Sequence, residues 1–521
     1  MAAWGDGYVT DVSYTAGFYR ELTPNWLWLT AVLAGQRPPD LTQPFRWAEL
    51  GCGNGLSGNV VAACHPNAEV WGFDFNPGHI ETATHLARLA GLANAHFREA
   101  SFADLAADDS LPMFDFIVVH GVFSWIAPAV RAQLLDVIGR RLKPGGLVYV
   151  SYNTPAGWDA MAPLQYFMRH LARGMTGRSD QIMPRVLDSI ERMVEANAAF
   201  FRRNPELVNR LKNLRRADPR YVAHEYLNQH WVPMMFTEAA EHLAGVKCSF
   251  MASATLTDNY DYTSVPAPML PLLAEAPDRA TRECLRDFGA AQSFRRDVFR
   301  RGLTSMSSAE QLATLDTMRL LPVLPRPKEG FRFNSAIGEM QGNPDIYGPL
   351  LDRLYSTGSL SFAEARGIGA MSPRPPAQVL ESLALLISSG LAHHALPDAV
   401  QEQARAGASG FNAAVSRLNS LGGDMAILAA PAIGSAVGAE LLETYARPLL
   451  SGPQPPDEDA LSTCMRGALH AADRSLLKNG EPVRDPDTER ELLRETALRL
   501  TGEQWGIRQA LGIYGEPARE A

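Results

Sequence analysis

The chain is poor in cysteine, and its few cysteines are scattered. Only five occur among 521 residues, and no two of them have C-x-x-C spacing. Structural zinc sites and disulfide-stapled domains both use closely spaced cysteines. We therefore expect neither, and we expect a reducing cytoplasm as the location. The five are Cys52, Cys64, Cys248, Cys284 and Cys464.

Long uncharged runs are also lacking. The longest, residues 425–439, contains Pro431 and is shorter than the roughly 20 apolar residues that a membrane span needs. This run predicts either a buried helix or a strand-and-turn element. The first seven residues lack the basic and apolar segments of a signal peptide. The sequence therefore predicts a cytoplasmic protein without a membrane span.

Positive charge is in deficit, because 48 Lys and Arg face 57 Asp and Glu, a net charge of −9 at pH 7. Such a chain has no general field to hold a nucleic acid, and we do not expect that partner. Local basic clusters occur at residues 202–203, 210–216 and 295–301. They recur at helical spacing beside apolar residues, which predicts solvated helix faces or a domain interface.

The chain does contain a glycine-rich turn directly after a strand-like run. The run ends at Glu49, and glycines follow at positions 51, 53 and 55. Glycine tolerates unusual backbone angles and lets a nucleoside cofactor approach closely. Asp74 ends the next strand-like run about twenty residues later, where a carboxylate can bind ribose hydroxyls. That position suits both NAD and S-adenosylmethionine, so Asp74 does not discriminate between them.

Glu49 favours S-adenosylmethionine over a dinucleotide. A pyrophosphate is dianionic and is best received by backbone N–H groups at a helix N-terminus, so an adjacent acid repels it. The sulfonium and amino groups of S-adenosylmethionine are cationic and are attracted to an acid. The alternative role for Glu49 is a local ion pair, for example with Arg46.

The remaining pattern of residues 1–160 alternates between strand and helix. Residues 114–119 predict a buried parallel strand, and residues 141–146 predict a helix end and tight turn before another strand at 147–151. This alternation predicts an α/β fold with a doubly wound, Rossmann-like sheet, followed by mainly helical domains. The predicted helices cover residues 24–33, 56–64, 77–90 and 128–142.

Four motifs together resemble class I S-adenosylmethionine-dependent methyltransferases. They are ELGCGNG (49–55), FDFNP (73–77), FDFIVVHG (114–121) and LKPGGLVYVSYN (142–153). Residues 14–24, 120–125, 151–153 and 157–158 resemble bacterial enzymes of this class that carry a methyltransferase regulatory domain. Residues 224–227 and 294–299 resemble that regulatory domain itself. Some such relatives, notably the rickettsial enzymes, are protein-lysine methyltransferases of outer-membrane proteins.

The resemblance extends to about residue 303 and has one departure. Relatives usually have Pro-Gly-Trp after the Ser-Tyr-Asn run, whereas this chain has Ala156 inserted before Gly157 and Trp158. The resemblance implies a methyltransferase domain at residues 1–160 and a helical insertion with the regulatory domain at 161–320. Residues 245–256 read as strand, which either completes the sheet or forms a separate layer.

Beyond the proline-rich run at 321–330, which predicts a linker, residues 331–521 predict a mainly helical C-terminal domain. Its first part predicts three helices, at 347–355, 361–368 and 376–389, followed by a short strand-like run at 390–396. This order is similar to a winged-helix module.

Ligands of a doubly wound sheet bind beyond the carboxyl ends of its strands. The glycines are expected at the methionine part, Asp74 at the ribose, and Ser101 with Phe102 at the adenine. His120 either contacts a ligand or caps backbone groups. The predicted cofactor-binding residues are Tyr14, Glu49, Gly51, Gly53, Gly55, Asp74, Asn76, Ser101, Phe102 and His120.

The methyl acceptor is expected beside the ends of the fourth and fifth strands. The predicted catalytic residues there are Trp125, Tyr152, Asn153 and Trp158. Aromatic walls suit a lysine side chain through cation-π contact, although these rings could instead seal a domain junction. Methyl transfer depends on alignment more than on a strong base, so we expect no metal site. His224 and Glu225 predict a structural or acceptor-facing role rather than metal ligation.

The sequence therefore predicts an S-adenosylmethionine-dependent methyltransferase that acts on a protein side chain such as lysine, with the later domains selecting the acceptor. Alternative functions are methylation of a small molecule or RNA, and a non-catalytic interaction protein that binds S-adenosylmethionine. A homodimer is compatible with the sequence. The identity of the acceptor and the role of the C-terminal domain stay open.

Overall fold

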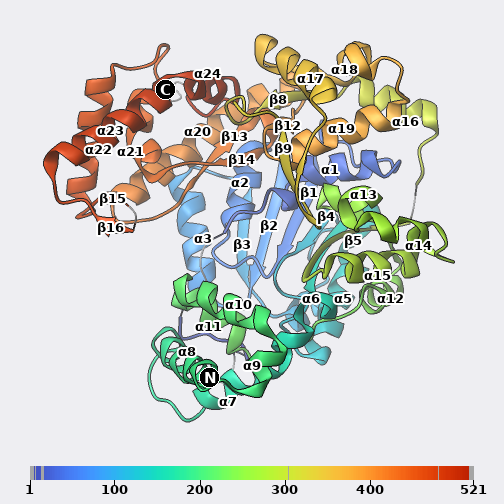
Figure 1. Cartoon of the computed structure of the whole chain (residues 1–521). Helices are drawn as coiled ribbons and strands as arrows, with labels where there is room; N and C mark the ends of the chain where they lie inside the picture. The colour runs from blue at the N-terminus through green and yellow to red at the C-terminus, as the bar shows by residue number, and fades with distance from the viewer. Residues whose placement is uncertain (1–4, 6, 13–16, 303, 479, 516–521) are drawn as a thin grey trace.

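A seven-stranded sheet forms the centre of the protein (Figure 1). The computed structural model describes the whole chain except residues 1–4, 6, 13–16, 303, 479 and 516–521. The strand order is β3-β2-β1-β4-β5-β7-β6; β1 to β5 are parallel, and β7 runs antiparallel to both of its neighbours. The strands are β1 (Phe45–Leu50), β2 (Ala68–Asp74), β3 (Ala95–Glu99), β4 (Phe114–Val119), β5 (Leu142–Asn153), β6 (Cys248–Ser253) and β7 (Phe294–Arg301).

Helices connect the parallel strands, as the sequence predicts. Asn76 caps α3, since its side chain accepts from the N–H of Gly78, and Ser101 with Asp104 forms a capping box at the start of α4. The helices are α1 (Pro24–Leu33), α2 (Leu56–Cys64), α3 (Pro77–Leu89), α4 (Phe102–Ala107) and α5 (Pro128–Arg141). The predicted α/β class with a Rossmann-like sheet is confirmed.

A long helical insertion separates β5 from β6. Its helices α7 to α11 bury their own apolar cluster, which includes Met168, Met183, Val186 and Ile190. In Figure 1 they lie across the lower end of the sheet. They are α6 (Pro155–Trp158), α7 (Ala162–Ala172), α8 (Ser179–Glu195), α9 (Ala199–Arg203), α10 (Pro205–Arg216) and α11 (Pro219–Tyr226), followed by α12 (Phe236–Gly245).

The strand-like segment around residue 250 completes the sheet. It forms β6, which pairs with β7, and β7 pairs with β5 from Leu147–Arg300 to Asn153–Phe294. Between β6 and β7 lie α13 (Asp261–Ser264), α14 (Leu270–Ala274) and α15 (Arg279–Ala290).

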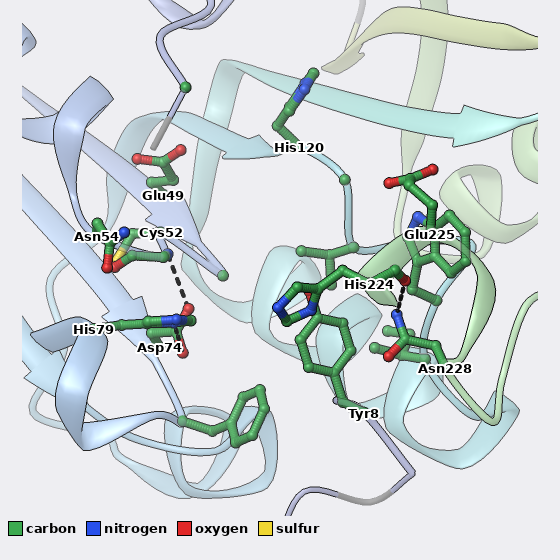
Figure 2. Close-up of a pocket in the computed structure, with 18 of the residues that line it drawn as sticks. Tyr8, Glu49, Cys52, Asn54, Asp74, His79, His120, His224, Glu225 and Asn228 are labelled. Carbon is green, nitrogen blue, oxygen red and sulfur yellow. Dashed lines mark hydrogen bonds and ion pairs between the residues drawn. The ribbon is translucent and has the colours of Figure 1, made fainter. Parts of the chain in front are cut away.

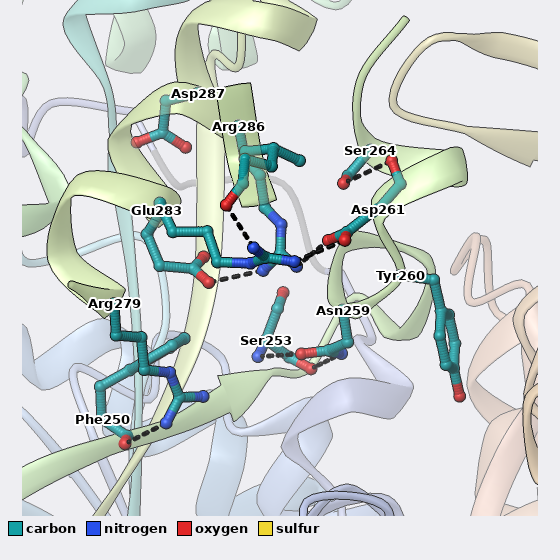
Figure 3. Close-up of polar contacts among 12 residues, drawn as sticks. Phe250, Ser253, Asn259, Tyr260, Asp261, Ser264, Arg279, Glu283, Arg286 and Asp287 are labelled. Carbon is teal, nitrogen blue, oxygen red and sulfur yellow. Dashed lines mark hydrogen bonds and ion pairs between the residues drawn. The ribbon is translucent and has the colours of Figure 1, made fainter. Parts of the chain in front are cut away.

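Buried charges fix α15 against β7. Arg295 of β7 forms ion pairs with Glu283 and Asp287 of α15 at 2.8 and 2.7 Å, and with Asp297 at 2.8 Å. Figure 3 shows the outer part of this network, where Arg286 bridges Glu283 and Asp261. Paired buried charges cost much less than isolated ones, and removal of one partner destabilises the rest.

A three-stranded sheet of order β11-β8-β12 begins the C-terminal part, and the three predicted helices are confirmed as α17, α18 and α19. The prediction of a linker from residue 321 is wrong at its start, because Leu321 and Pro322 belong to the central strand β8. Pro322 is the last residue of that strand, so its missing N–H leaves the pairing of Leu320 and Leu321 intact. The elements are α16 (Ser308–Asp316), β8 (Arg319–Pro322), β9 (Arg332–Ser335), β10 (Gly338–Gln341), α17 (Pro344–Thr357), β11 (Leu360–Ser361), α18 (Phe362–Gly367), α19 (Pro376–Ser388) and β12 (Ala392–His394).

The long helix α20 (Asp398–Ser420) packs directly on α2 and α3. A Cβ atom at Gly407 would lie 2.7 Å from the carbonyl oxygen of Ala63, and one at Gly410 would lie 2.5 Å from that of Ala90. Only glycine permits this approach. For the uncharged run at 425–439 the sequence left two alternatives, a buried helix or a strand-and-turn element. The structure has the second, because β13 pairs with β14. The last elements are β13 (Ile427–Ala430), β14 (Ser435–Gly438), α21 (Leu441–Leu450), α22 (Glu458–Ala471), β15 (Leu477–Lys478), β16 (Glu481–Pro482), α23 (Pro486–Thr501) and α24 (Glu503–Ala510).

Across the described part of the chain, every helix is too short or too polar to cross a membrane.

Candidate functional site

A cavity of about 600 Å³ opens at the carboxyl ends of the parallel strands. This is the edge at which open α/β sheets bind ligands. Most of the residues predicted for the site line it. They are Glu49, Gly51, Gly53, Asp74, Ser101, Phe102, His120, Trp125, Asn153 and Trp158.

Four predicted site residues are placed elsewhere or are not described. Gly55 begins α2 with φ +67, and a Cβ there would lie 2.4 Å from that of Ala83, so this glycine permits helix packing. Asn76 caps α3. Tyr152 points to the opposite face of β5 from Tyr149, because strand side chains alternate, and donates a 2.6 Å hydrogen bond to Asp297. Tyr14 lies outside the described residues.

The carboxylate of Asp74 is held in a fixed orientation. Its Oδ2 accepts a hydrogen bond from the N–H of Gly53, and its Oδ1 accepts one from the N–H of Asn76, both at 2.9 Å. Nδ1 of His79 lies 3.2 Å from Oδ1. Gly53 has φ +52, and no atom lies within 4 Å of the position a Cβ would take. The backbone of the turn is therefore open to a ligand beside a preorganised acid.

Glu49 is buried beside this turn, with 5% of its surface exposed. Its Oε2 has no hydrogen-bond partner among the described residues. Burial, reinforced by the charge of Asp74, raises the pKa of Glu49 to about 8. A buried carboxylate with one oxygen left without a partner is stabilised by a cation, so this position fits the amino and sulfonium groups of S-adenosylmethionine.

His120 is a neutral imidazole in the cavity wall. Its Nδ1 lies 2.9 Å from the hydroxyl oxygen of Tyr149, and its ring packs on Tyr19 with 3.8 Å between centroids. Burial, and secondarily the charge of Arg296, lowers the pKa of His120 to about 3. Of the two predicted roles, the position in the cavity favours ligand contact, because the ring is held by a tyrosine side chain rather than by backbone groups.

The far wall comes from α11 and from the start of the chain, which motif spacing does not reveal. Figure 2 shows Tyr8, His224, Glu225 and Asn228 across the cavity from Glu49 and Asp74. Asn228 ties the two segments together, because its Oδ1 accepts from the N–H of Val9 at 2.8 Å and its Nδ2 donates to the carbonyl of His224 at 2.6 Å. The only sequence feature that indicated this wall was the His224-Glu225-Tyr226 run.

Tryptophans form another part of the wall. Trp231 lies between Trp125 and Trp158, with ring centroids 6.0 and 5.1 Å away. Its Nε1 is 3.4 Å from Oδ1 of Asn153, and the guanidinium of Arg210 lies 3.7 Å over the ring of Trp158. Nε1 of Trp158 also donates to the carbonyl of Ser293 at 2.8 Å. Trp125 and Trp158 line the cavity, and Trp231 packs against both of them.

In the described ranges, no group of three or more His, Cys, Asp and Glu side chains is arranged to hold a metal ion. The site combines two acids at the sheet edge, aromatic side walls, a third acid, Glu225, on α11, and one cation, Arg296, on β7.

Two family models match the chain. The methyltransferase domain matches residues 48–148, which include the glycine turn, and the predicted methyltransferase regulatory domain matches residues 218–301, from α11 to β7. Over 513 residues the chain is 34% identical to an uncharacterized protein of Synechocystis sp., covering 98% of this chain and 99% of that protein. Over 305 residues it is 28% identical to an uncharacterized protein of Rickettsia prowazekii, covering 56% and 53%.

Among solved structures, that of PKMT2 from Rickettsia typhi in complex with AdoHcy matches with a TM-score of 0.68 at 19% identity. The match covers 95% of this chain and 99% of PKMT2. The shared fold therefore includes the C-terminal third as well as the sheet.

Proposed function

The chain belongs to the class I S-adenosylmethionine-dependent methyltransferases that carry a methyltransferase regulatory domain, and on this premise we propose that it methylates the side-chain amine of a lysine in another protein. S-adenosylmethionine is the methyl donor. The proposal concerns the acceptor and the residues that receive it.

The observation that supports an amine acceptor is the placement of Glu225 among tyrosines. The charge of Glu225 adds to burial in raising the pKa of Tyr19 and Tyr221, and it acts on Tyr8 behind burial and Asp74. All four residues line the cavity. A carboxylate within aromatic rings attracts an ammonium group by charge and by cation-π contact. Arg296 also lines the cavity, and its charge opposes that of Glu225 on the pKa of Tyr19 but has the smaller effect.

Each end of the cavity then has a separate role. Bound S-adenosylmethionine supplies a methyl group activated by the positive sulfur. Glu49 and Asp74 bind and orient the donor, since one offers an orphaned carboxylate oxygen and the other a fixed carboxylate. Trp125 and Trp158 restrict the path of the acceptor and exclude water.

The amine must be neutral to attack, so its proton has to leave before transfer. A carboxylate oxygen of Glu225 is the proposed acceptor of that proton. His120 is a poor candidate because its lowered pKa of about 3 makes it a weak base.

The test is incubation of the purified full chain with isotopically labelled S-adenosylmethionine and a bacterial lysate, followed by mass spectrometry. We expect label on lysine side chains of proteins, and none with an Asp74→Ala variant. Label confined to small molecules or RNA would refute the proposal and would favour the corresponding acceptor instead.

A further inference from the structure

The helical insertion has a charge opposite to that of the protein as a whole. Residues 162–226, which form α7 to α11, contain twelve Lys and Arg against seven Asp and Glu. The whole chain has a net charge of −9. Positive charge is therefore concentrated in one structural unit, while the rest of the molecule is strongly acidic.

Much of this charge is not neutralised within the insertion. Four of its seven acids form ion pairs with arginines of the insertion. Arg215 pairs with Asp188 and Glu191, Arg178 with Asp180, and Arg220 with Asp218. Six cations are exposed and have neither an ion-pair partner nor a side-chain hydrogen bond among the described residues, whereas the exposed Arg185 donates to the carbonyl of Thr176. These insertion cations are Arg173, Arg192, Arg202, Arg203, Lys212 and Arg216.

The insertion is also the unit that builds the acceptor side of the cavity. Its last helix, α11, contributes Tyr221 and Glu225 to the lining, and Arg210 of α10 covers Trp158. Figure 1 shows α10 and α11 over the lower end of the sheet. A protein segment that places a side chain in the cavity must therefore pass beside the insertion.

The charge pattern has two zones of opposite sign. The described cavity lining holds three acidic side chains, Glu49, Asp74 and Glu225, and one Arg, Arg296, whereas the adjoining insertion has the unpaired cations. The complementary partner is a lysine with acidic residues around it. A nucleic-acid backbone would match the cations but would bring phosphates toward the three carboxylates, so the pattern favours a protein.

We propose that the insertion cations are a docking surface for an acidic segment of the acceptor protein, and that the enzyme selects lysines flanked by Asp and Glu. This inference rests on the proposed function and adds a selection rule to it. Exposed charges act through long-range attraction that salt screens over roughly 8 Å at physiological ionic strength. The preference is therefore expressed in kcat/KM, through KM, and weakens as salt is added.

The experiment compares two peptides of equal length with one lysine each, flanked by Asp and Glu in one and by Ser and Asn in the other. The full chain methylates both at low and at high salt. We expect kcat/KM to be roughly tenfold higher for the acidic peptide at low salt, with the ratio falling toward one at high salt.

A charge-neutralised variant, R202Q/R203Q/K212Q/R216Q, is expected to lose the preference and to keep the rate on the neutral peptide. The matched control, R417Q/R466Q/K478Q/R494Q, removes four exposed cations of the C-terminal part and is expected to keep the preference. Thermal unfolding and binding of S-adenosylmethionine verify that both variants are folded.

Equal kcat/KM for the two peptides, or an acidic preference that survives in the insertion variant, would overturn the docking surface while leaving lysine methylation intact. If labelled RNA appears and neither peptide nor any lysate protein is methylated, the proposed function itself fails.

Discussion

The carboxylate of Asp74, at the end of β2, accepts a 2.9 Å hydrogen bond from the backbone N–H of Gly53, in the turn after β1. The two motifs proposed to bind the donor therefore form one unit, in which the acid stabilises the conformation of the glycine turn. Loss of the Asp74 carboxylate should affect both parts of the donor site.

Asp74→Ala should weaken the binding of S-adenosylmethionine roughly tenfold to a hundredfold, because a fixed carboxylate and its hold on Gly53 are lost together. Titration calorimetry measures the change in Kd. Glu99→Gln is the matched control. Glu99 lies beside Asp74 in the register of β2 and β3, but it is exposed and does not line the cavity. A similar loss in the control would show that charge alone is responsible.

Glu49→Gln should stabilise the protein without its donor at alkaline pH. The unfolded carboxyl ionises near pH 4.5 and the folded one near 8, so between these values the unfolded state holds fewer protons and the stability of the wild type falls as pH rises. The variant should gain roughly 2–4 kcal/mol at pH 8.5 and little at pH 4. Chemical denaturation across this pH range measures the difference, and a gain independent of pH would contradict the assignment.

The same variant should bind S-adenosylmethionine more weakly, because Gln cannot neutralise a cation. In the wild type, binding at pH 7 should release a proton from Glu49, since a nearby cation favours its ionised form. Calorimetry in buffers of different ionisation enthalpy measures this release, and E49Q should abolish it.

Glu225→Gln should lower kcat/KM for a lysine peptide by roughly tenfold or more while leaving the Kd of S-adenosylmethionine within about twofold, because Glu225 lines the wall opposite the donor residues. Glu241→Gln, an exposed acid on α12, is the control. An equal loss of donor affinity would show that Glu225 belongs to the donor site instead.

Gly407→Ala should destabilise the protein by roughly 1–3 kcal/mol, because the new methyl group meets the carbonyl of Ala63 at 2.7 Å. In α22, Gly467 has no atom within 4 Å of a Cβ position, so Gly467→Ala should be neutral or mildly stabilising, as helix propensity predicts. Thermal unfolding should therefore show a clear decrease in Tm for Gly407→Ala, and no decrease or a small increase for Gly467→Ala.

The part of the cavity lining at the sheet edge could be predicted from the sequence, because each of its residues lies at the end of a strand that can be recognised locally. Glu49, Gly53, Asp74 and His120 all lie at such ends, and the parallel sheet brings them together. The predicted helices of the C-terminal part could also be recognised locally, because each has apolar residues at helical spacing.

The wall that joins the start of the chain to α11 could not be predicted in this way. Tyr8 and Glu225 are more than 200 residues apart, and only the packing of the insertion places them on one wall. Tyr152 illustrates a second limit, because it lies in the expected strand but on the face opposite the cavity. A one-residue difference in strand register reverses such an assignment. Pro322 shows that the first residues of a proline-rich run can still form the end of a strand.

The contact of α20 with α2 has a consequence for folding while the chain is being synthesised. Val60, Ala63 and Cys64 of α2 share a buried cluster with Phe411 of α20, which is made more than 340 residues later. At roughly 5–20 residues per second, the ribosome needs tens of seconds to supply that covering helix. The helix that follows the glycine turn therefore keeps an uncovered apolar face for most of translation. An enzyme cut short before α20 would expose this face permanently, so we expect residues 1–160 to aggregate when expressed alone.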